Sequence, residues 1–176
     1  MVDHQVISQL LQEYFVIKGK VIINDQAEVS VINVPGVSPP VSVLLKKTLD
    51  MGVLPVIFDR VEGDFVAAER NVKTLKGFPR FIKGNLFTNL NNHLRQLYDC
   101  QIDHVGGTWS HTYRESQGIL RMLVAQAIYL DTDTGAIHKA QQVKHILNAH
   151  AGQGKKGALA CAVELVKAGY KDNAKW

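Results

Sequence analysis

The segments Val61–Phe65 (VEGDF), Ile82–Leu86 (IKGNL) and Val105–Trp109 (VGGTW) share one pattern in the middle of the chain. Each contains an aliphatic residue, a variable residue, a glycine, a polar residue and a large apolar residue, in that order. The segments start 21 and then 23 residues apart. A repeat period in this range, with a strand-like segment in each unit, is typical of solenoids, in which successive units stack on one another and share a core.

This period predicts a leucine-rich-repeat-like strand stack. We expect each glycine at the tight entry to a short strand, where a side chain would clash or where φ is positive. Phe65, Leu86 and Trp109 would then form one buried column. Because three units are about the minimum for a stable stack, the flanking segments are expected to cover both ends. The alternative is a chance similarity of glycine-containing turns in an ordinary mixed domain.

The segment before the repeats predicts a helix and a hairpin. Apolar residues recur at three- and four-residue steps over Asp3–Tyr14, and Asp3 is suited to the N-cap. Over Phe15–Asn33 the apolar period becomes two on both sides of an Asn-Asp-Gln turn, which predicts a β-hairpin. The proline-rich segment Val34–Pro40 predicts a loop. The period does not decide whether Val41–Leu45 is a strand or begins a helix.

The segment after the repeats predicts helices. An apolar stripe begins at Ile119 and reaches Leu130, and further helices are expected over Ala136–Ala149 and Ala158–Ala168. Gly169 is suited to the position after the last of these helices. We expect the terminal Trp176 to fold back onto the helices.

The predicted class is therefore α+β. Residues 1–54 would form the N-terminal helix and β-hairpin cap, residues 55–115 degenerate leucine-rich-like repeats, and residues 116–176 a basic helical lobe. A length of 176 residues with 46% hydrophobic and 20% charged residues excludes global disorder. No apolar run approaches the roughly 18 residues that span a bilayer, and the first residues do not resemble a signal peptide. Cys100 and Cys161 are too few for a disulfide framework, so we expect a cytoplasmic protein without a membrane partner.

The positive charge is concentrated at the C-terminal end. Residues 1–132 contain 13 basic and 13 acidic residues, whereas residues 133–176 contain seven lysines and three acids, which accounts for the net charge of +4. A basic lobe favours an acidic partner. The alternative is that this charge serves solubility alone.

Four stretches resemble a family: Tyr14–Val31 (YFVIKGKVIINDQAEVSV), Leu54–Phe65 (LPVIFDRVEGDF), Leu75–Leu86 (LKGFPRFIKGNL) and Gly152–Trp176 (GQGKKGALACAVELVKAGYKDNAKW). They are similar to small bacteriophage- and prophage-encoded proteins that carry degenerate leucine-rich-like repeats after a β-hairpin. Those proteins end in a Gly-Lys-x-Gly…Lys-Ala-Gly-Tyr-Lys-x-Asn-Ala-x-Trp helix. The resemblance extends over most of the chain from about Tyr14. It implies a phage or prophage gene and the host cytoplasm, and it supplies no catalytic residues.

Three groups of residues are candidates for chemistry. Gly152–Gly157 precedes a helix, as in a phosphate-binding loop, but lacks the P-loop spacing, which leaves simple anion binding or a helix-to-helix turn. His138 and His145 are two helical turns apart, which is too far to share a metal ion unaided, so no metal or other cofactor is expected. The region Asp99–His111, which includes Cys100 and His104, could hold a small hydrolase or transferase site, but no geometry assigns a catalytic residue.

We therefore expect a non-catalytic, phage-encoded interaction protein that binds and modulates a host or defence protein with an acidic surface. Such a protein would act in host takeover or anti-defence through the open face of the stack and the basic helical end. The alternative is a nucleic-acid-binding protein that uses the basic C-terminal lobe, where lysines alternate with Tyr170 and Trp176. The candidate partner-binding residues are Arg70, Lys73, Lys155, Lys156 and Lys171.

Overall fold

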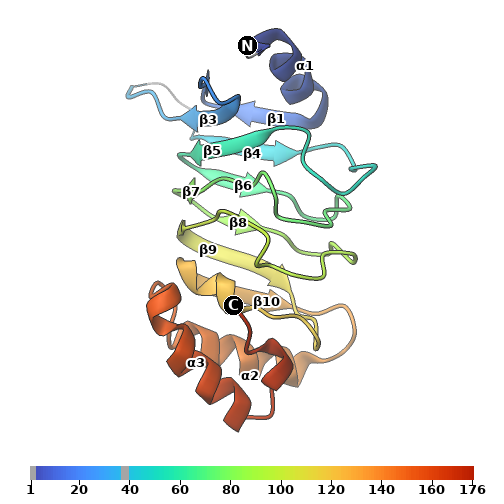
Figure 1. Cartoon of the computed structure of the whole chain (residues 1–176), viewed down its shortest axis with the longest axis vertical. Helices are drawn as coiled ribbons and strands as arrows, with labels where there is room; N and C mark the ends of the chain where they lie inside the picture. The colour runs from blue at the N-terminus through green and yellow to red at the C-terminus, as the bar shows by residue number, and fades with distance from the viewer. Residues whose placement is uncertain (1–2, 37–39) are drawn as a thin grey trace.

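A computed structural model describes residues 3–36 and 40–176. Within these residues, strand-bearing coils stack between helix α1 (His4–Tyr14) at one end and helices α2 (Ile137–Asn148) and α3 (Lys155–Lys167) at the other (Figure 1). Two short 3-10 helices, η1 (Leu120–Val124) and η2 (Lys171–Asn173), belong to the C-terminal end. The strands are β1 (Phe15–Lys18), β2 (Lys20–Ile23), β3 (Glu28–Ile32), β4 (Ser42–Leu45), β5 (Ile57–Val61), β6 (Asp64–Val66), β7 (Phe81–Ile82), β8 (Leu86–Phe87), β9 (His104–Thr112) and β10 (Ala125–Asp131).

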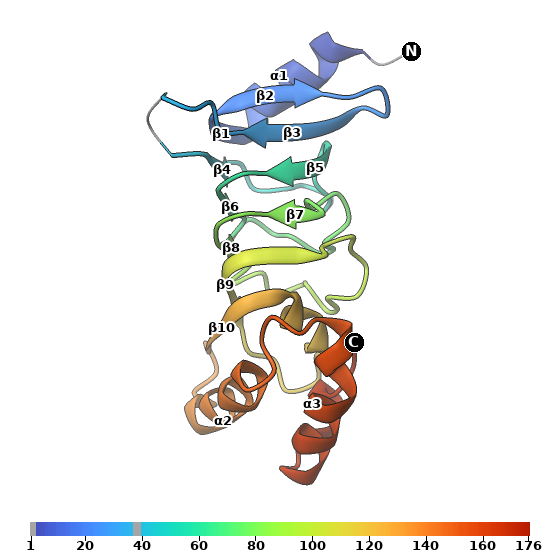
Figure 2. The ribbon, with the colours of Figure 1, turned by 90° about the vertical axis from the view of Figure 1, so that its left-hand side faces the viewer.

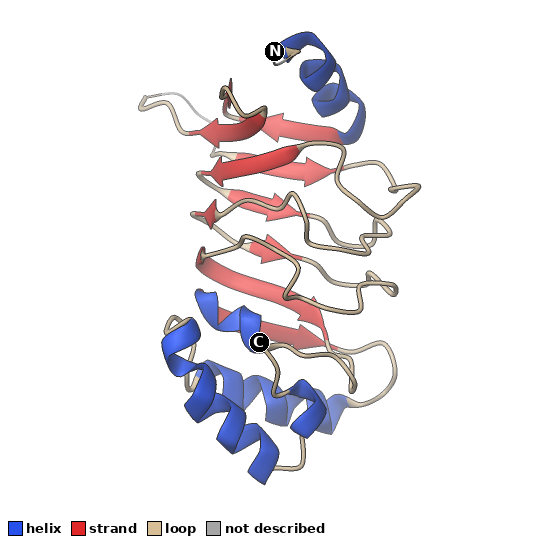
Figure 3. Ribbon diagram, viewed as in Figure 1, coloured by secondary structure: helices blue, strands red, loops and turns tan. Residues whose placement is uncertain are grey.

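The strands form two columns that run along the stack. One column is β1, β4, β6, β8, the C-terminal part of β9, and β10; the other is β2, β3, β5, β7 and the start of β9. Pairing is parallel in both columns, apart from the antiparallel pairs β1–β4 and β2–β3 at the N-terminal end. Figure 2 shows the second column with its strands one above another. The described chain is therefore an α+β protein with a repeat-like strand stack, and Figure 3 shows its helices gathered at the two ends.

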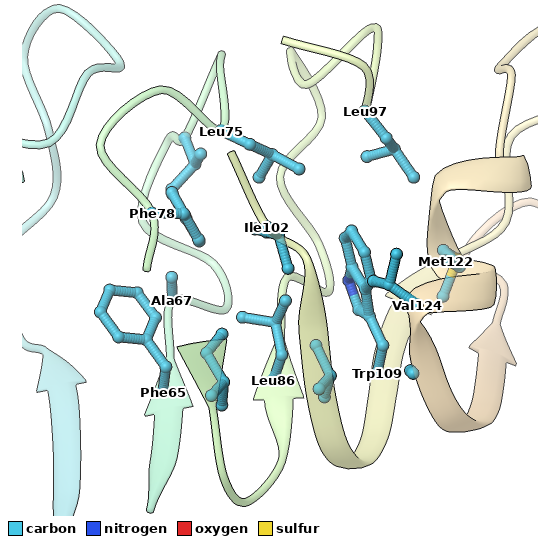
Figure 4. Packing of buried hydrophobic residues seen from close by; sticks show 14 of the residues in the cluster. Phe65, Ala67, Leu75, Phe78, Leu86, Leu97, Ile102, Trp109, Met122 and Val124 are labelled. Atoms are coloured by element: carbon cyan, nitrogen blue, oxygen red, sulfur yellow. The ribbon is translucent and has the colours of Figure 1, made fainter. Parts of the chain in front are cut away.

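The predicted apolar column is confirmed. Phe65 is the register partner of Leu86, and Leu86 is the partner of Trp109. All three side chains are fully buried, and they follow one another along the stack in Figure 4. The first two repeats nevertheless contribute two strands each, because the motif glycine lies between β5 and β6 in the first unit and between β7 and β8 in the second. In the third unit Gly106 lies within β9, which pairs with both β7 and β8.

The motif glycines are required by close approach between coils. A Cβ on Gly63 would lie 1.8 Å from the carbonyl oxygen of Val41, and a Cβ on Gly106 would lie 2.2 Å from that of Lys83. Gly84 is confined in the same way, since a Cβ there would lie 2.8 Å from the carbonyl carbon of Gly63. None of these glycines has a positive φ. The clash, and not the backbone conformation, therefore excludes a side chain at the corner of each coil.

The polar residue of the motif joins one coil to the next. The Asp64 carboxylate accepts a hydrogen bond from the backbone N–H of Asn85 (2.8 Å). The Asn85 amide oxygen accepts one from the backbone N–H of Thr108, also 2.8 Å long. The N–H of Asn85 lies between β7 and β8 and that of Thr108 lies within β9, and each has a side-chain oxygen of the preceding coil as its acceptor.

At the N-terminal end, the predicted helix and N-cap are confirmed, since Asp3 Oδ1 accepts a hydrogen bond from the N–H of Gln5 (3.1 Å). The hairpin is formed by β2 and β3 alone. Gly19 has a φ of +132°, which only glycine adopts readily, and there the chain turns so that β1 pairs with β4 in the other column. The ambiguous segment after the prolines is strand β4. The predicted loop Val34–Pro40 lies partly outside the described residues.

The prediction of a helix from Ile119 to Leu130 is wrong. A 3-10 helix, η1, is followed by strand β10, which pairs in parallel with β9 and so extends the stack past residue 115. The hydrophobic period misled because η1 is buried almost all round, while in β10 the buried Ile128 and Leu130 alternate with the exposed Tyr129. The two later helices are confirmed as α2 and α3.

Candidate functional site

The structure separates the five predicted contact residues into two groups. Lys155 and Lys156 form the first turn of α3, and Lys171 begins η2 immediately after that helix. Arg70 and Lys73 lie in the loop between β6 and β7, which Figure 1 shows well away from α3. Arg70 is also partly buried and donates to the carbonyl of Glu69. The basic C-terminal group is thus the one that forms a continuous candidate surface.

Helix α3 has two apolar faces, and only one of them is buried. Gly157, Cys161 and Leu165 are spaced by four residues and pack toward the core. On the opposite side, Leu159, Val163 and Val166 have exposed fractions of 78%, 44% and 51%. Their spacing of four and then three residues places them in one stripe along the helix. An aliphatic stripe of this kind is ordinarily covered, so its exposure makes this side of α3 a candidate contact surface.

Lysines lie at both ends of this exposed stripe. Lys155 and Lys156 lie one turn before Leu159, and Lys167, Lys171 and Lys175 lie beyond Val166. All five side chains are exposed, and none forms an ion pair with any residue of the described chain. The acid of α3, Glu164, is instead directed to His150, at 3.2 Å. We call the stripe together with these five lysines the α3 surface.

The α3 surface contains a groove of about 500 Å³ between the helix and the chain that follows it. Its floor is apolar, and its walls are the two segments that contribute lysines. The residues around it are Ala162, Val163, Val166, Lys167, Lys171, Ala174 and Lys175.

The chain that forms the far wall of the groove is held firmly. Asn173 is buried, accepts a hydrogen bond from the Tyr113 hydroxyl (2.9 Å) and donates to the carbonyl of Gln117 (2.8 Å). Trp176 packs against the core, and the guanidinium of Arg121 lies 5.2 Å from its ring centre. The groove is therefore part of the folded structure and does not depend on a loose tail.

The glycine-rich turn before α3 is a structural connection. The N–H of Gly152 donates to the carbonyls of Leu123 (3.0 Å) and Ala125 (2.7 Å), and the N–H of Gly154 also donates to Leu123 (3.0 Å). These groups tie the turn to the end of η1 and the start of β10. Since an anion-binding loop needs free N–H groups, the helix-to-helix turn is the interpretation that the geometry favours.

The region Asp99–His111 contains no assembled catalytic set. Asp99 accepts a hydrogen bond from the Thr74 hydroxyl (2.9 Å), and His104 stacks on Phe81 with ring centres 4.9 Å apart. The Cys100 thiol donates to a backbone carbonyl, and burial raises its pKa, so it is a poor nucleophile at neutral pH. His111 is fully buried and cannot reach a substrate.

His111 belongs to a closed chain of buried hydrogen bonds. The indole N–H of Trp109 donates to the Thr88 hydroxyl (3.0 Å), which lies 2.8 Å from His111 Nδ1. His111 Nε2 lies 2.7 Å from the Gln117 carbonyl oxygen, whose amide nitrogen donates to the carbonyl of Leu94. This network assigns the proton to Nε2 and leaves the ring neutral. Burial lowers the pKa of His111, which fits a structural role.

The histidines of the C-terminal lobe do not gather into a metal site. Across residues 3–36 and 40–176, no three His, Cys, Asp or Glu side chains come together in a way that could hold a metal ion. The same residues contain no helix that is both long enough and apolar enough to cross a bilayer.

The open faces of the stack carry ordered side chains as well. On the β1 column, Val16, Leu44 and Tyr129 face outward and are 39 to 49% exposed. On the other column, the Arg60 guanidinium lies 3.9 Å from the centre of the Phe81 ring, which in turn stacks on His104. These faces are secondary candidates, because the apolar row of register partners Val16, Leu44, Val66 and Phe87 is at most 42% exposed, which is less than Leu159, Val163 and Val166 of α3.

Comparison of the chain with protein-family models, with curated proteins and with solved structures gives no match.

The residues missed from the sequence are Leu159, Val163 and Val166. Their helical spacing was visible in the sequence, but so was the spacing of Gly157, Cys161 and Leu165 on the opposite side. A helix with apolar residues on two sides is normally buried on both. Which side stays open depends on where α3 docks, and that depends on its contacts with η1 and η2.

Proposed function

We propose that this protein is a non-catalytic interaction protein that binds and modulates another protein through the α3 surface. The observation that carries the proposal is the exposed aliphatic stripe of α3 with five unpaired lysines at its ends. An apolar centre with a charged rim is the usual anatomy of a protein-binding surface, and the sign of this rim selects an acidic partner.

A second observation supports function over solubility. Lys155 and Lys156 occupy the first turn of α3, which contains no acidic residue. Positive charge at a helix N-terminus is unfavourable, by about 0.3 to 1 kcal/mol for each side chain near the surface. If these lysines served solubility alone, they could lie at the C-terminal end of the helix, where positive charge carries no such penalty. Carboxylates of an acidic partner would remove this penalty at the moment of binding.

The resemblance to phage and prophage proteins extends the proposal. The coils would be degenerate leucine-rich-like repeats, and they would act as a rigid support that presents the α3 surface. The protein would be made in the cytoplasm of a bacterial host, where its partner would be a host or defence protein.

The experiment is affinity capture of the tagged full chain from bacterial cells, with quantitative mass spectrometry of the recovered proteins. Val163→Lys places a charge in the stripe, and Val53→Lys is its matched control, because Val53 is 43% exposed and lies in the β4–β5 loop. A partner recovered with the wild type and with Val53→Lys, but lost with Val163→Lys, supports the proposal. Equal recovery with both variants, or no partner at all, would refute it.

Nucleic-acid binding is the second candidate, and the unpaired lysines are the observation that favours it. The same variant separates the two functions. An added lysine at Val163 would weaken docking of an apolar protein surface, whereas it would maintain or strengthen binding to a polyanion. Retention of a single-stranded oligonucleotide by Val163→Lys, with a steep loss on adding salt, would therefore favour nucleic acid. The absence of any shift at low salt would exclude it.

A further inference from the structure

We infer that the segment of the partner that docks on the α3 surface is an amphipathic α-helix with acidic residues beside its apolar stripe. This inference rests on the function proposed above. It adds the conformation and the chemistry of the docked segment, which that proposal does not specify.

The shape of the surface favours a helix. The stripe Leu159–Val166 covers about two turns of α3 and continues into a groove bounded on its far side by the chain around Ala174. A helix that lies along such a groove places its side chains at positions i, i+3 or i+4, and i+7 against the floor of the groove. An extended strand would need an open row of backbone N–H and C=O groups to pair with, and the backbone of α3 is occupied by its own hydrogen bonds.

The charges define the flanks of the docked helix. Lys155 and Lys156 lie at one end of the stripe and Lys167, Lys171 and Lys175 at the other, so carboxylates are needed at both ends of the ligand. Asp172 is the one acid on this part of the tail, and it lines a neighbouring hollow together with Glu115, Lys139 and Lys171. No salt bridge joins the five lysines to an acid of the described chain, so their charges are available to the acids of a ligand.

Two other occupants fit less well. A second copy of this chain, related by a two-fold axis, would bring the lysine-rich ends of the two α3 surfaces against each other. A lipid surface is flat and favours large side chains that insert into it, whereas the apolar atoms here are two valines and alanines recessed in a groove, beside one leucine.

The test is selection from a displayed library of random peptides, long enough for several helical turns, on the immobilised full chain. We expect enriched peptides with aliphatic residues at helical spacing and Asp or Glu around them. A synthetic copy of the most enriched peptide should gain helical circular dichroism on binding. Its affinity should fall by about tenfold or more for Val163→Lys and for the pair Lys155→Glu and Lys156→Glu.

Matched controls and alternative occupants complete the experiment. Val53→Lys, and the pair Lys18→Glu and Lys20→Glu at the opposite end of the molecule, should bind the peptide as the wild type does. Enrichment without helical spacing, or with basic flanks, would overturn the inference. Two other results would also overturn the inference if no peptide is selected. One is binding of the wild type, but not of Val163→Lys, to phosphatidylserine vesicles. The other is a dimer in sedimentation that Val163→Lys abolishes. If capture from cells depends on Val163 but no acidic helix is selected, the proposed function stands and this inference fails.

Discussion

Replacement of Gly63 by alanine is the most direct test of how the coils are held together. The new Cβ would lie 1.8 Å from the carbonyl oxygen of Val41, whereas side-chain carbons in proteins essentially never come within 3.0 Å of another heavy atom. The two coils must therefore separate by more than an ångström at this corner. That shift strains the core by about 1 to 3 kcal/mol. It also weakens the hydrogen bonds from Asp64 to Val41 and from Gly84 to Gly63, each worth about 0.5 to 1.5 kcal/mol.

We therefore expect Gly63→Ala to lower the free energy of unfolding by roughly 4 kcal/mol. Gly135→Ala is the control: Gly135 has a φ of +79° and a Cβ there would meet no atom within 4 Å, so this substitution should cost only about 1 to 2 kcal/mol. The smaller conformational freedom of the unfolded alanine chain affects both variants alike. The assay is urea unfolding followed by tryptophan fluorescence and by far-UV circular dichroism, whose transitions must coincide. If Gly63→Ala costs no more than Gly135→Ala, the close packing of the corners is wrong.

Three further predictions concern polar side chains that form hydrogen bonds within the fold. The fold lowers the pKa of His111 from its ordinary 6.5, so on acidification the unfolded chain takes up a proton before the folded chain does. Below pH 6.5 the free energy of unfolding should therefore fall by up to about 1.4 kcal/mol per pH unit. His111→Gln should flatten this slope between pH 6.5 and 5 in urea titrations. The Asn148 side chain accepts a hydrogen bond from the N–H of Ile128 (3.0 Å) and donates one to the carbonyl of Ile128 (2.8 Å), at the free edge of β10. Asn148→Ala should therefore lower the stability by about 1 to 3 kcal/mol in thermal unfolding. A loss below about 0.5 kcal/mol, which is less than one hydrogen bond contributes, would contradict that role. Asn85→Ala should cost a similar amount because the Thr108 N–H loses its acceptor, whereas Asn85→Asp, which keeps an acceptor as Asp64 does in the preceding coil, should cost clearly less; equal losses would refute this account.

The stack could be predicted from sequence because its contacts repeat. A glycine, a polar residue and a large apolar residue recur at a fixed offset, since each coil meets the next in the same way: Phe65 on Leu86, and Leu86 on Trp109. Features that occur only once in the chain were harder to predict from the sequence. Gly19 belongs to an unbroken alternating pattern, and only the three-dimensional path shows that the chain turns there into the other column. In the same way, the buried 3-10 turn before β10 has the apolar content of a helix.

The candidate site was only partly predictable, for a related reason. Charge is visible in sequence, and Lys155, Lys156 and Lys171 were therefore found. Which side chains are exposed depends on how α3 packs against the rest of the fold. Cys161 and Leu165 face inward, and Leu159 on the opposite side is therefore exposed. The two apolar sides of the helix differ in size, since the inward side has a glycine at its first position. The contacts of α3 with η1, η2 and α2 thus decide which of its sides is buried, and the opposite side is the one that we propose for a partner.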